Sequence, residues 1–498
     1  METVIVIGAG ASHDFCKVVR KEDRQEYIKA GVSMPTGEEL IRQMMDFESD
    51  LLLYGRKGYL RQMAEELTPS SSDNGKFVQE IVDKDLIALR GAVSIRVALS
   101  KHGLIQEGWS WCDGQQRPTI HACGERWKHP IIEELWGPDS ERHKFFVEKI
   151  AIKLGFKNHL RLAALLKHYH PESIDNFLTS IKYKLVDVEI DLGDGEVDRK
   201  YTNDDLVNAG KELIVYWLLK AENAKIFNAE HKIWYRWLRE AIINSYANKS
   251  FAEFEESDEK KRSEKAKEII KENINKIQII NFNYDRSLEY YLDKQMPDFA
   301  EEIKNKIFHP YGGLKNCGYQ YGGLKADLRN PSIGISDIFQ KIKDVAEKEI
   351  KIIGEERNSD KDFFDRLRKD SRKLYFLGFG FIEDNLSRFL GEDCFNITYD
   401  INDAKSDYVS HKVFYTNYEN AQKVEQKVQN YFRPCVKAPP SSIRLGMGSM
   451  INPMTLTDIE SLNVNVDKIE RDKIRDKIFT KSSKGVYDAL NEDFALII

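Results

Sequence analysis

Cysteine is scarce in this sequence, and its few copies are scattered. The 498 residues include six cysteines, and no two of them form a C-x-x-C pair: Cys16, Cys112, Cys123, Cys317, Cys394 and Cys435. This spacing argues against the common structural zinc sites and against a disulfide framework. It fits a protein of the reducing cytoplasm.

The sequence also lacks long apolar runs and an excess of positive charge. No stretch of about 18 apolar residues occurs, so we expect no membrane span. No basic segment followed by an apolar run marks a secretory signal. The formal net charge is −6, with 31% charged residues of mixed sign. A general nucleic-acid coat is therefore not expected, but a local basic patch for direct nucleic-acid binding stays open.

What the sequence does contain, at its start, is a strand followed by glycines. Residues 4–7 are four β-branched apolar residues, which predict a buried parallel strand. They lead into Gly8, Ala9 and Gly10, and Ser12 follows. The glycines would let the backbone approach a pyrophosphate, and Ser12 could cap the next helix. The segment favours a nucleotide site over a plain tight turn, and the plain turn stays the alternative.

The dehydrogenase fingerprint is incomplete at this turn. That fingerprint requires a third glycine and an acidic residue about 20 positions later, at the end of a second strand. His13 and Asp14 follow Ser12 instead, and the charged run 21–26 has no strand pattern. We therefore do not expect a hydride-transferring dehydrogenase.

Apolar runs typical of strands cluster late in the chain, with helical patterns between several of them. They occupy residues 277–281, 306–309, 373–377, 395–399 and 412–415, and helical patterns cover 206–219 and 338–350. Alternating strands and helices predict a doubly wound sheet. We expect an α/β fold: a Rossmann-like parallel sheet (residues 1–45 and 275–432), a large helical insertion (46–274) and a short C-terminal extension (433–498).

Polar residues follow three of the predicted strands at their carboxyl ends, where open α/β sheets bind ligands. Asn283 and Asp285 follow the first strand, His309 and Tyr311 the second, and Gly378, Gly380 and Asp384 the third. A helix cap would explain only one of the two residues Asn283 and Asp285. A lone histidine is more often a satisfied core residue than a catalyst, so His309 has that alternative too.

The order of these motifs resembles the sirtuin-like domain of bacterial defence proteins. The motifs are Gly8-Ala9-Gly10-Ala11-Ser12, Met34-Pro35-Thr36-Gly37, Phe282-Asn283-Tyr284-Asp285, His309-Pro310-Tyr311-Gly312 and Gly378-Phe379-Gly380-Phe381. Within the predicted insertion, residues 170–178 are similar to a segment of such proteins. The resemblance covers about residues 1–45 and 275–432, and the C-terminal extension lies outside it.

The resemblance implies a Rossmann-like domain that binds NAD+. It implies that Asn283 holds the nicotinamide ribose and the attacking nucleophile, and that Asp285 contacts the nicotinamide end. His309 is the candidate catalytic histidine, although Tyr311 stands where sirtuins have histidine before the glycine. The cofactor-binding residues implied are Gly8, Ala9, Gly10, Ser12, Pro35, Thr36, Tyr311, Gly378, Gly380 and Asp384.

The four-cysteine zinc module of classical sirtuins is absent from the sequence, so the chain resembles members that hydrolyse NAD+. We expect an NAD+ glycohydrolase that uses NAD+ as substrate, binds no metal, and depletes NAD+ in anti-phage defence. The expected partners are further copies of the chain and a defence protein such as an ATPase or an Argonaute-like protein. The helical insertion and the extension are the segments available for gating, assembly or docking.

Other functions stay open at this stage. The sheet could sense NAD+ or ADP-ribose without cleaving it, or act as a zinc-free deacylase, or belong to an effector guided by nucleic acid. Whether cleavage ends in hydrolysis or in a cyclised product is equally open.

Overall fold

The computed structural model describes most of the chain in segments. These are residues 2–14, 34–55, 105–112, 115–122, 150–189, 201–224, 227, 234–248, 259–314, 317–330, 333–353, 355, 359–381, 385–386, 395–400, 410–417, 422–437, 454–455, 476, 478–484, 486, 489–493 and 496. The chain forms two compact units. One comprises Met1–Glu39, Leu218–Gly322 and Glu349–Ile498, and the other comprises Leu40–Trp217 and Gly323–Lys348.

The first unit is built on a six-stranded parallel sheet, as predicted. Its strands are β1 (Thr3–Ile7), β4 (Ile277–Asn281), β5 (Ile307–Phe308), β6 (Lys373–Leu377), β8 (Lys412–Thr416) and β11 (Phe479–Ser482). All five residues of β1 are buried, which explains why its apolar run does not alternate with polar residues. In β1, Ile5 pairs with Ile279 of β4 and with Tyr375 of β6.

The order of the strands places a topological switch point at β1. The sheet runs β11-β8-β6-β1-β4-β5. Counted along the chain within this sheet, that is the order 3-2-1-4-5-6 read from the β5 edge, which is the order of dinucleotide-binding folds. The chain passes outward from β1 through β4 to β5 and then returns to the other side of β1 with β6. Ligands of such sheets bind outside the carboxyl ends of the strands at this point.

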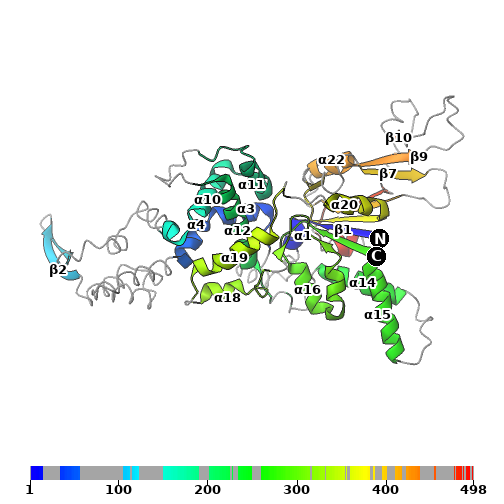
Figure 1. Ribbon diagram of the computed structural model, residues 1–498, viewed down its shortest axis with the longest axis horizontal. Coiled ribbons are helices and arrows are strands. Elements are labelled where there is room, and N and C mark those ends of the chain that lie inside the picture. Colours follow the sequence, from blue (N-terminus) through cyan, green and yellow to red (C-terminus); the bar gives the residue numbers. More distant parts are fainter. Residues whose placement is uncertain are drawn as a thin grey trace. The chain divides into compact units, whose positions relative to one another are not determined.

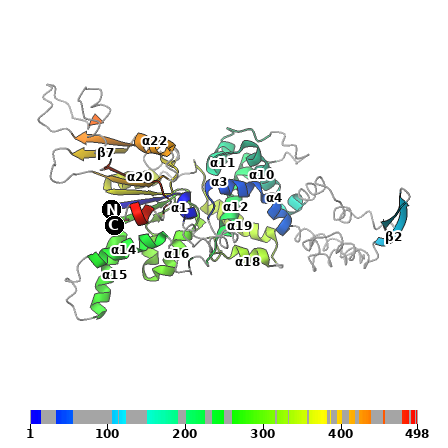
Figure 2. The ribbon, with the colours of Figure 1, turned by 180° about the vertical axis from the view of Figure 1, so that it is seen from behind.

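Helices cover both faces of the sheet. Helix α20 (Ser359–Asp370) lies on one side of the strands, and α14 (Tyr235–Asn248), α15 (Glu259–Lys276) and α16 (Ser287–Gln295) lie on the other (Figures 1 and 2). The highly charged α15 is mostly exposed. Short η6 (Pro297–Phe299) and α17 (Ala300–Lys304) connect α16 toward β5.

Segments near and beyond residue 433 also form strands in this unit. Strand β9 (Phe432–Lys437) crosses the predicted boundary and pairs in parallel with β7 (Phe395–Asp400). It also pairs with β10 (Met454–Thr455), in a three-stranded sheet separate from the main one. Helix α22 (Gln422–Tyr431) leads into β9. Strand β11 of the extension forms the edge of the main sheet, because its backbone pairs with β8.

The second unit is largely helical. The described helices that lie wholly or mostly within it are α3 (Gly37–Met45), α4 (Phe47–Asp50), η2 (Leu51–Gly55), α10 (Lys157–Tyr169), α11 (Ile174–Lys182), α12 (Asn203–Ala221), α18 (Leu324–Arg329) and α19 (Ile335–Glu349). Its core includes the ring of Phe47, whose centroid lies 5.8 Å from that of Phe156, 6.2 Å from Tyr216 and 5.6 Å from Phe339. A hairpin of β2 (Ile105–Cys112) and β3 (Gln115–Ala122) also belongs to this stretch of the chain.

The limits of the two units differ from those expected from sequence. Residues 218–274, expected in the insertion, belong to the unit with the sheet. Residues 323–348, expected with the sheet, belong to the helical unit, because the aromatic core of that unit includes Phe339 of α19. No helix in the described segments combines the length and apolar composition needed to cross a membrane.

Candidate functional site

Two glycine turns meet at the switch point. Strand β1 ends at Ile7 and β6 at Leu377, and each is followed by a glycine. The Gly8 amide donates to the Leu377 carbonyl at 3.0 Å, and the Gly10 amide donates to the Gly378 carbonyl at 3.1 Å. The two turns therefore pack backbone against backbone.

This packing accounts for the glycines without any ligand. A Cβ on Gly8 would lie 2.5 Å from the Gly378 oxygen, and one on Gly10 would lie 3.1 Å from the same atom. Gly378 also has a φ of +57°, in the region that favours glycine. The sequence alone suggested that these glycines admit a phosphate. The structure shows that they allow the two turns to pack against each other, and that the Gly10 amide in the first turn of α1 (Ala9–Asp14) is used in that contact.

Asn283 links this turn to the end of β4. Its side-chain amide donates to the Gly8 carbonyl at 2.9 Å and to Ser12 Oγ at 2.8 Å. Its backbone amide donates to Asn281 Oδ1 at 3.1 Å, and the residue is buried. The structure thus brings together two motifs that the sequence had selected separately: the first glycine turn, with Gly8 and Ser12, and the end of the later strand, with Asn283.

Asp285 is buried at the start of α16. Its Oδ1 accepts hydrogen bonds from the Ser287 amide at 3.0 Å and from the Ser287 hydroxyl. Asp285 therefore satisfies an amide of the first turn of α16, whereas Asn283 bonds elsewhere. Burial raises the pKa of the Asp285 carboxyl, and the hydrogen bonds from Ser287 and Ser12 partly oppose that rise.

His309 is held on both ring nitrogens. Nδ1 lies 2.9 Å from the Asn283 carbonyl, and because a carbonyl only accepts, Nδ1 carries the proton. Nε2 lies 2.6 Å from Glu289 Oε1 on α16. The side chain is only 5% exposed. In this arrangement His309 fixes the backbone of Asn283, and no ring nitrogen is left to accept a proton from a substrate.

Glu289 is a site residue that sequence reasoning missed. It lies four residues after Asp285, and its side chain is buried. An acidic residue in the first turn of the helix that follows this polar strand end is a signal that could have selected it. The contact with His309 itself depends on the loop after β5.

Among the other predicted binding residues, Tyr311 and Thr36 have structural partners. Tyr311 donates from its hydroxyl to Asn385 Oδ1 at 2.6 Å and is buried. The Thr36 amide donates to Glu39 Oε2 at 2.9 Å, and the Glu39 amide donates to Thr36 Oγ1 at 3.3 Å, which is a capping box at the start of α3. Pro35 is buried, Gly380 is exposed, and Asp384 lies outside the described residues.

Two buried aromatic residues support the site from the segment expected in the insertion. Trp234 Nε1 donates to the Ala11 carbonyl at 2.8 Å. The Tyr235 hydroxyl lies 2.7 Å from Ser287 Oγ. Burial, with the charge of Asp285, raises the pKa of Tyr235 well above its ordinary value. Trp234 thus ties down α1, and Tyr235 ties down α16.

A buried ion pair anchors the loop between Asp285 and α16. Arg286 Nε lies 2.7 Å from Glu222 Oε1, and Arg286 Nη2 lies 3.0 Å from Glu222 Oε2. The Gly322 amide also donates to Glu222 Oε2 at 2.8 Å. Burial raises the pKa of Glu222, and Arg286 opposes that rise. Two-pronged pairing of this kind fixes direction as well as position.

Comparisons with known proteins leave the chain without a named relative. No protein-family model, no curated protein and no solved structure matches it. The observations that bear on its function are therefore the geometry of the site and the sequence motifs.

Proposed function

We propose that this protein hydrolyses NAD+ to nicotinamide and ADP-ribose. One observation carries the proposal: Asn283, Gly8 and Ser12 meet at the switch point of a sheet with dinucleotide-binding strand order. A dinucleotide at that edge would lie beside an amide, a hydroxyl and two buried carboxyl groups. Hydride transfer needs none of these groups, whereas cleavage of a glycosidic bond can use all of them.

Each group has a role suited to breaking the bond between nicotinamide and ribose. Loss of nicotinamide leaves positive charge on the ribose, and the carboxyl groups of Asp285 and Glu289 can stabilise that charge when ionised, in surroundings of low dielectric constant. The Asn283 amide can orient a ribose hydroxyl or the attacking water. To do so it must exchange its bond to Gly8 or Ser12 for one to the substrate. His309 acts here as a positioning residue for Asn283, which differs from the role of catalytic histidine that the resemblance implies.

The biological setting of this proposal comes from the motifs. Their order resembles defence proteins that consume NAD+, so the proposed role is NAD+ depletion in bacterial anti-phage defence. A homo-oligomer and a defence partner belong to the same proposal, as does a cytoplasmic location.

Nicotinamide release from NAD+ tests the proposal directly. We expect the wild-type protein to release nicotinamide and ADP-ribose, and Asn283→Ala to lower the rate about a hundredfold or more. Asn273→Ala is the matched control, because Asn273 is also buried and donates to a carbonyl, that of Ile242 at 2.9 Å. Full activity in Asn283→Ala, with both variants folded, would contradict the assignment.

A second candidate is a sensor that binds NAD+ or ADP-ribose without cleaving it. The observation that favours it is that both nitrogens of His309 and the Asn283 amide already have protein partners. Calorimetric binding of ADP-ribose with no nicotinamide release, both in vitro and in cells expressing the protein under phage challenge, would favour the sensor.

A further inference from the structure

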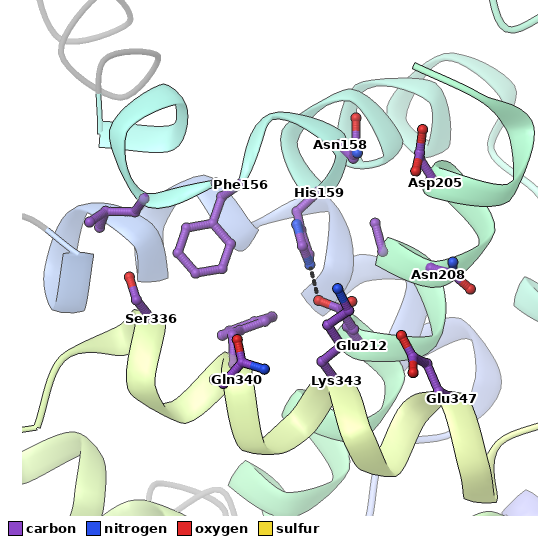
Figure 3. Close-up of a pocket in the computed structure, with 14 residues that line it drawn as sticks. Phe156, Asn158, His159, Asp205, Asn208, Glu212, Ser336, Gln340, Lys343 and Glu347 are labelled. Atoms are coloured by element: carbon purple, nitrogen blue, oxygen red, sulfur yellow. Dashed lines mark hydrogen bonds and ion pairs between the residues drawn. The ribbon is translucent and has the colours of Figure 1, made fainter. Parts of the chain in front are cut away.

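The helical unit contains a cavity of about 310 Å³ that the sheet site does not use. Helices α10, α12 and α19 line it (Figure 3). Its size is at the lower end of small-molecule sites, which span about 300–1,000 Å³. All its lining residues belong to the one unit.

A histidine–glutamate pair lies at the buried end of this cavity. His159 Nε2 lies 2.9 Å from Glu212 Oε2, and Figure 3 shows the imidazole of α10 reaching toward Glu212 of α12. The rings of Phe156 and Phe339 lie 5.2 Å from the imidazole, centroid to centroid, so the pair is set among aromatic side chains. Glu212 as a whole is 9% exposed.

Two polar atoms of this pair have no partner among the described residues. One is His159 Nδ1. The other is Glu212 Oε1, since the described contacts of that carboxylate all go through Oε2; unlike Nδ1, this oxygen is not fully enclosed by protein. A buried carboxylate without a full set of partners destabilises a fold, and apolar residues would pack such a position at least as well. Oε1 is therefore the atom of the pair that can accept a hydrogen bond from a cationic ligand in the cavity.

The rim of the cavity is negatively charged, as is the carboxylate of Glu212. Asp205 and Glu347 add two carboxylates to that of Glu212, and Lys343 adds a single ammonium group. Asn158, Asn208 and Gln340 add amides that can accept or donate. Lys343 extends from α19 toward Glu212 (Figure 3), but one cation does not neutralise three carboxylates.

The carboxylates do not converge as ligands of a metal ion would. In the described part of the chain, no three His, Cys, Asp or Glu side chains come together as a metal site. A ligand that contacts several of these groups must instead be extended and carry charge at more than one point. We propose that the cavity binds an aliphatic polyamine, with one ammonium group at Glu212 Oε1 and another at the rim beside Glu347.

Titration calorimetry with spermidine in 0.15 M salt tests the proposal on the full chain. We expect measurable binding to the wild type and roughly tenfold weaker binding to Glu347→Gln, the loss of about 1.4 kcal/mol. Asp344→Asn is the matched control, because Asp344 is an exposed acidic residue of α19 outside the cavity lining. This variant should bind spermidine as tightly as the wild type does. Glu212→Gln should abolish spermidine binding. Thermal unfolding of this variant, measured alongside, separates loss of the ligand contact from loss of the fold.

Lys343→Gln should change the affinity for spermidine in the opposite direction. Lys343 competes with the ligand for the same carboxylates, so its removal should tighten spermidine binding, by roughly fivefold. Generic damage to the cavity could only weaken binding. The proposal is overturned if spermidine does not bind, if 1,4-butanediol or Mg²⁺ binds equally well, or if Glu347→Gln and Asp344→Asn behave alike.

Discussion

The imidazole of His309 lies 2.6 Å from the carboxylate of Glu289, and its other nitrogen lies 2.9 Å from the carbonyl of Asn283. One side chain therefore joins the loop after β5 to both the end of β4 and the first turn of α16. The histidine that follows an apolar strand is a clamp in this structure. In the proposed reaction, His309 would act through Asn283 and Glu289, the two residues that its ring nitrogens contact.

Removal of Glu289 should weaken this clamp. We expect Glu289→Ala to lower the free energy of unfolding by about 1–3 kcal/mol, because it leaves a buried ring nitrogen without its partner. Glu289→Gln preserves a hydrogen bond and should lose less. Urea unfolding of both variants measures the difference, and equal stability of Glu289→Ala and wild type would mean that the clamp contributes nothing.

The contact between the glycine turns makes Gly8 sensitive to one added carbon. We expect Gly8→Ala to lose at least about 2 kcal/mol of stability or to fail to fold, because the new Cβ meets the Gly378 carbonyl. Gly37→Ala is the control. A Cβ on Gly37 would meet no atom within 4 Å, and the residue begins α3, so that variant should be neutral or up to about 1 kcal/mol more stable. Thermal unfolding of the two variants side by side checks the contrast.

The raised pKa of Asp285 gives stability a specific pH dependence. The folded protein holds the Asp285 proton more tightly than the unfolded chain does, so this group's contribution falls as pH rises between the ordinary carboxyl pKa and the raised one. Asn at this position keeps an oxygen that can accept from Ser287 but has no charge to bury. We expect Asp285→Asn to gain stability relative to the wild type as pH rises from about 4 to 7. Denaturant unfolding across that range measures it, and a constant difference between the two proteins would refute the pKa assignment.

Phenylalanine should replace Trp234 only in part. Trp234→Phe retains an aromatic ring but removes the indole N–H that donates to the Ala11 carbonyl. The buried Ala11 carbonyl then lacks its hydrogen-bond donor, so we expect the free energy of unfolding to fall by about 1–3 kcal/mol. NAD+, the proposed substrate, should also bind more weakly at the glycine turn. Trp217→Phe tests whether loss of any buried tryptophan has the same effect, because Trp217 is a buried tryptophan of α12 in the other unit. The ratio of the two losses in urea unfolding is the measurement.

The amino-acid sequence by itself determined the local elements. The apolar runs at residues 277–281 and 373–377 became β4 and β6 with the same limits, and the helical pattern at 206–219 became part of α12. A buried parallel strand needs a continuous apolar run, and a packed helix needs apolar residues three and four apart, so each leaves a local signature. The polar residues at the strand ends could be recognised from the sequence because they directly follow those apolar runs.

Only the tertiary structure decided which of those residues meet. Asn283 contacts Gly8 from 275 positions away, and Trp234 reaches Ala11 across 223. No local pattern encodes these contacts, because they arise when strands distant in sequence become neighbours in one sheet. In the same assembly, the glycines expected to approach a phosphate form a contact between two turns, and His309, the candidate catalytic histidine, holds the Asn283 backbone. Residue type sets what a side chain can do, and the neighbours supplied by the fold decide which of those possibilities is used.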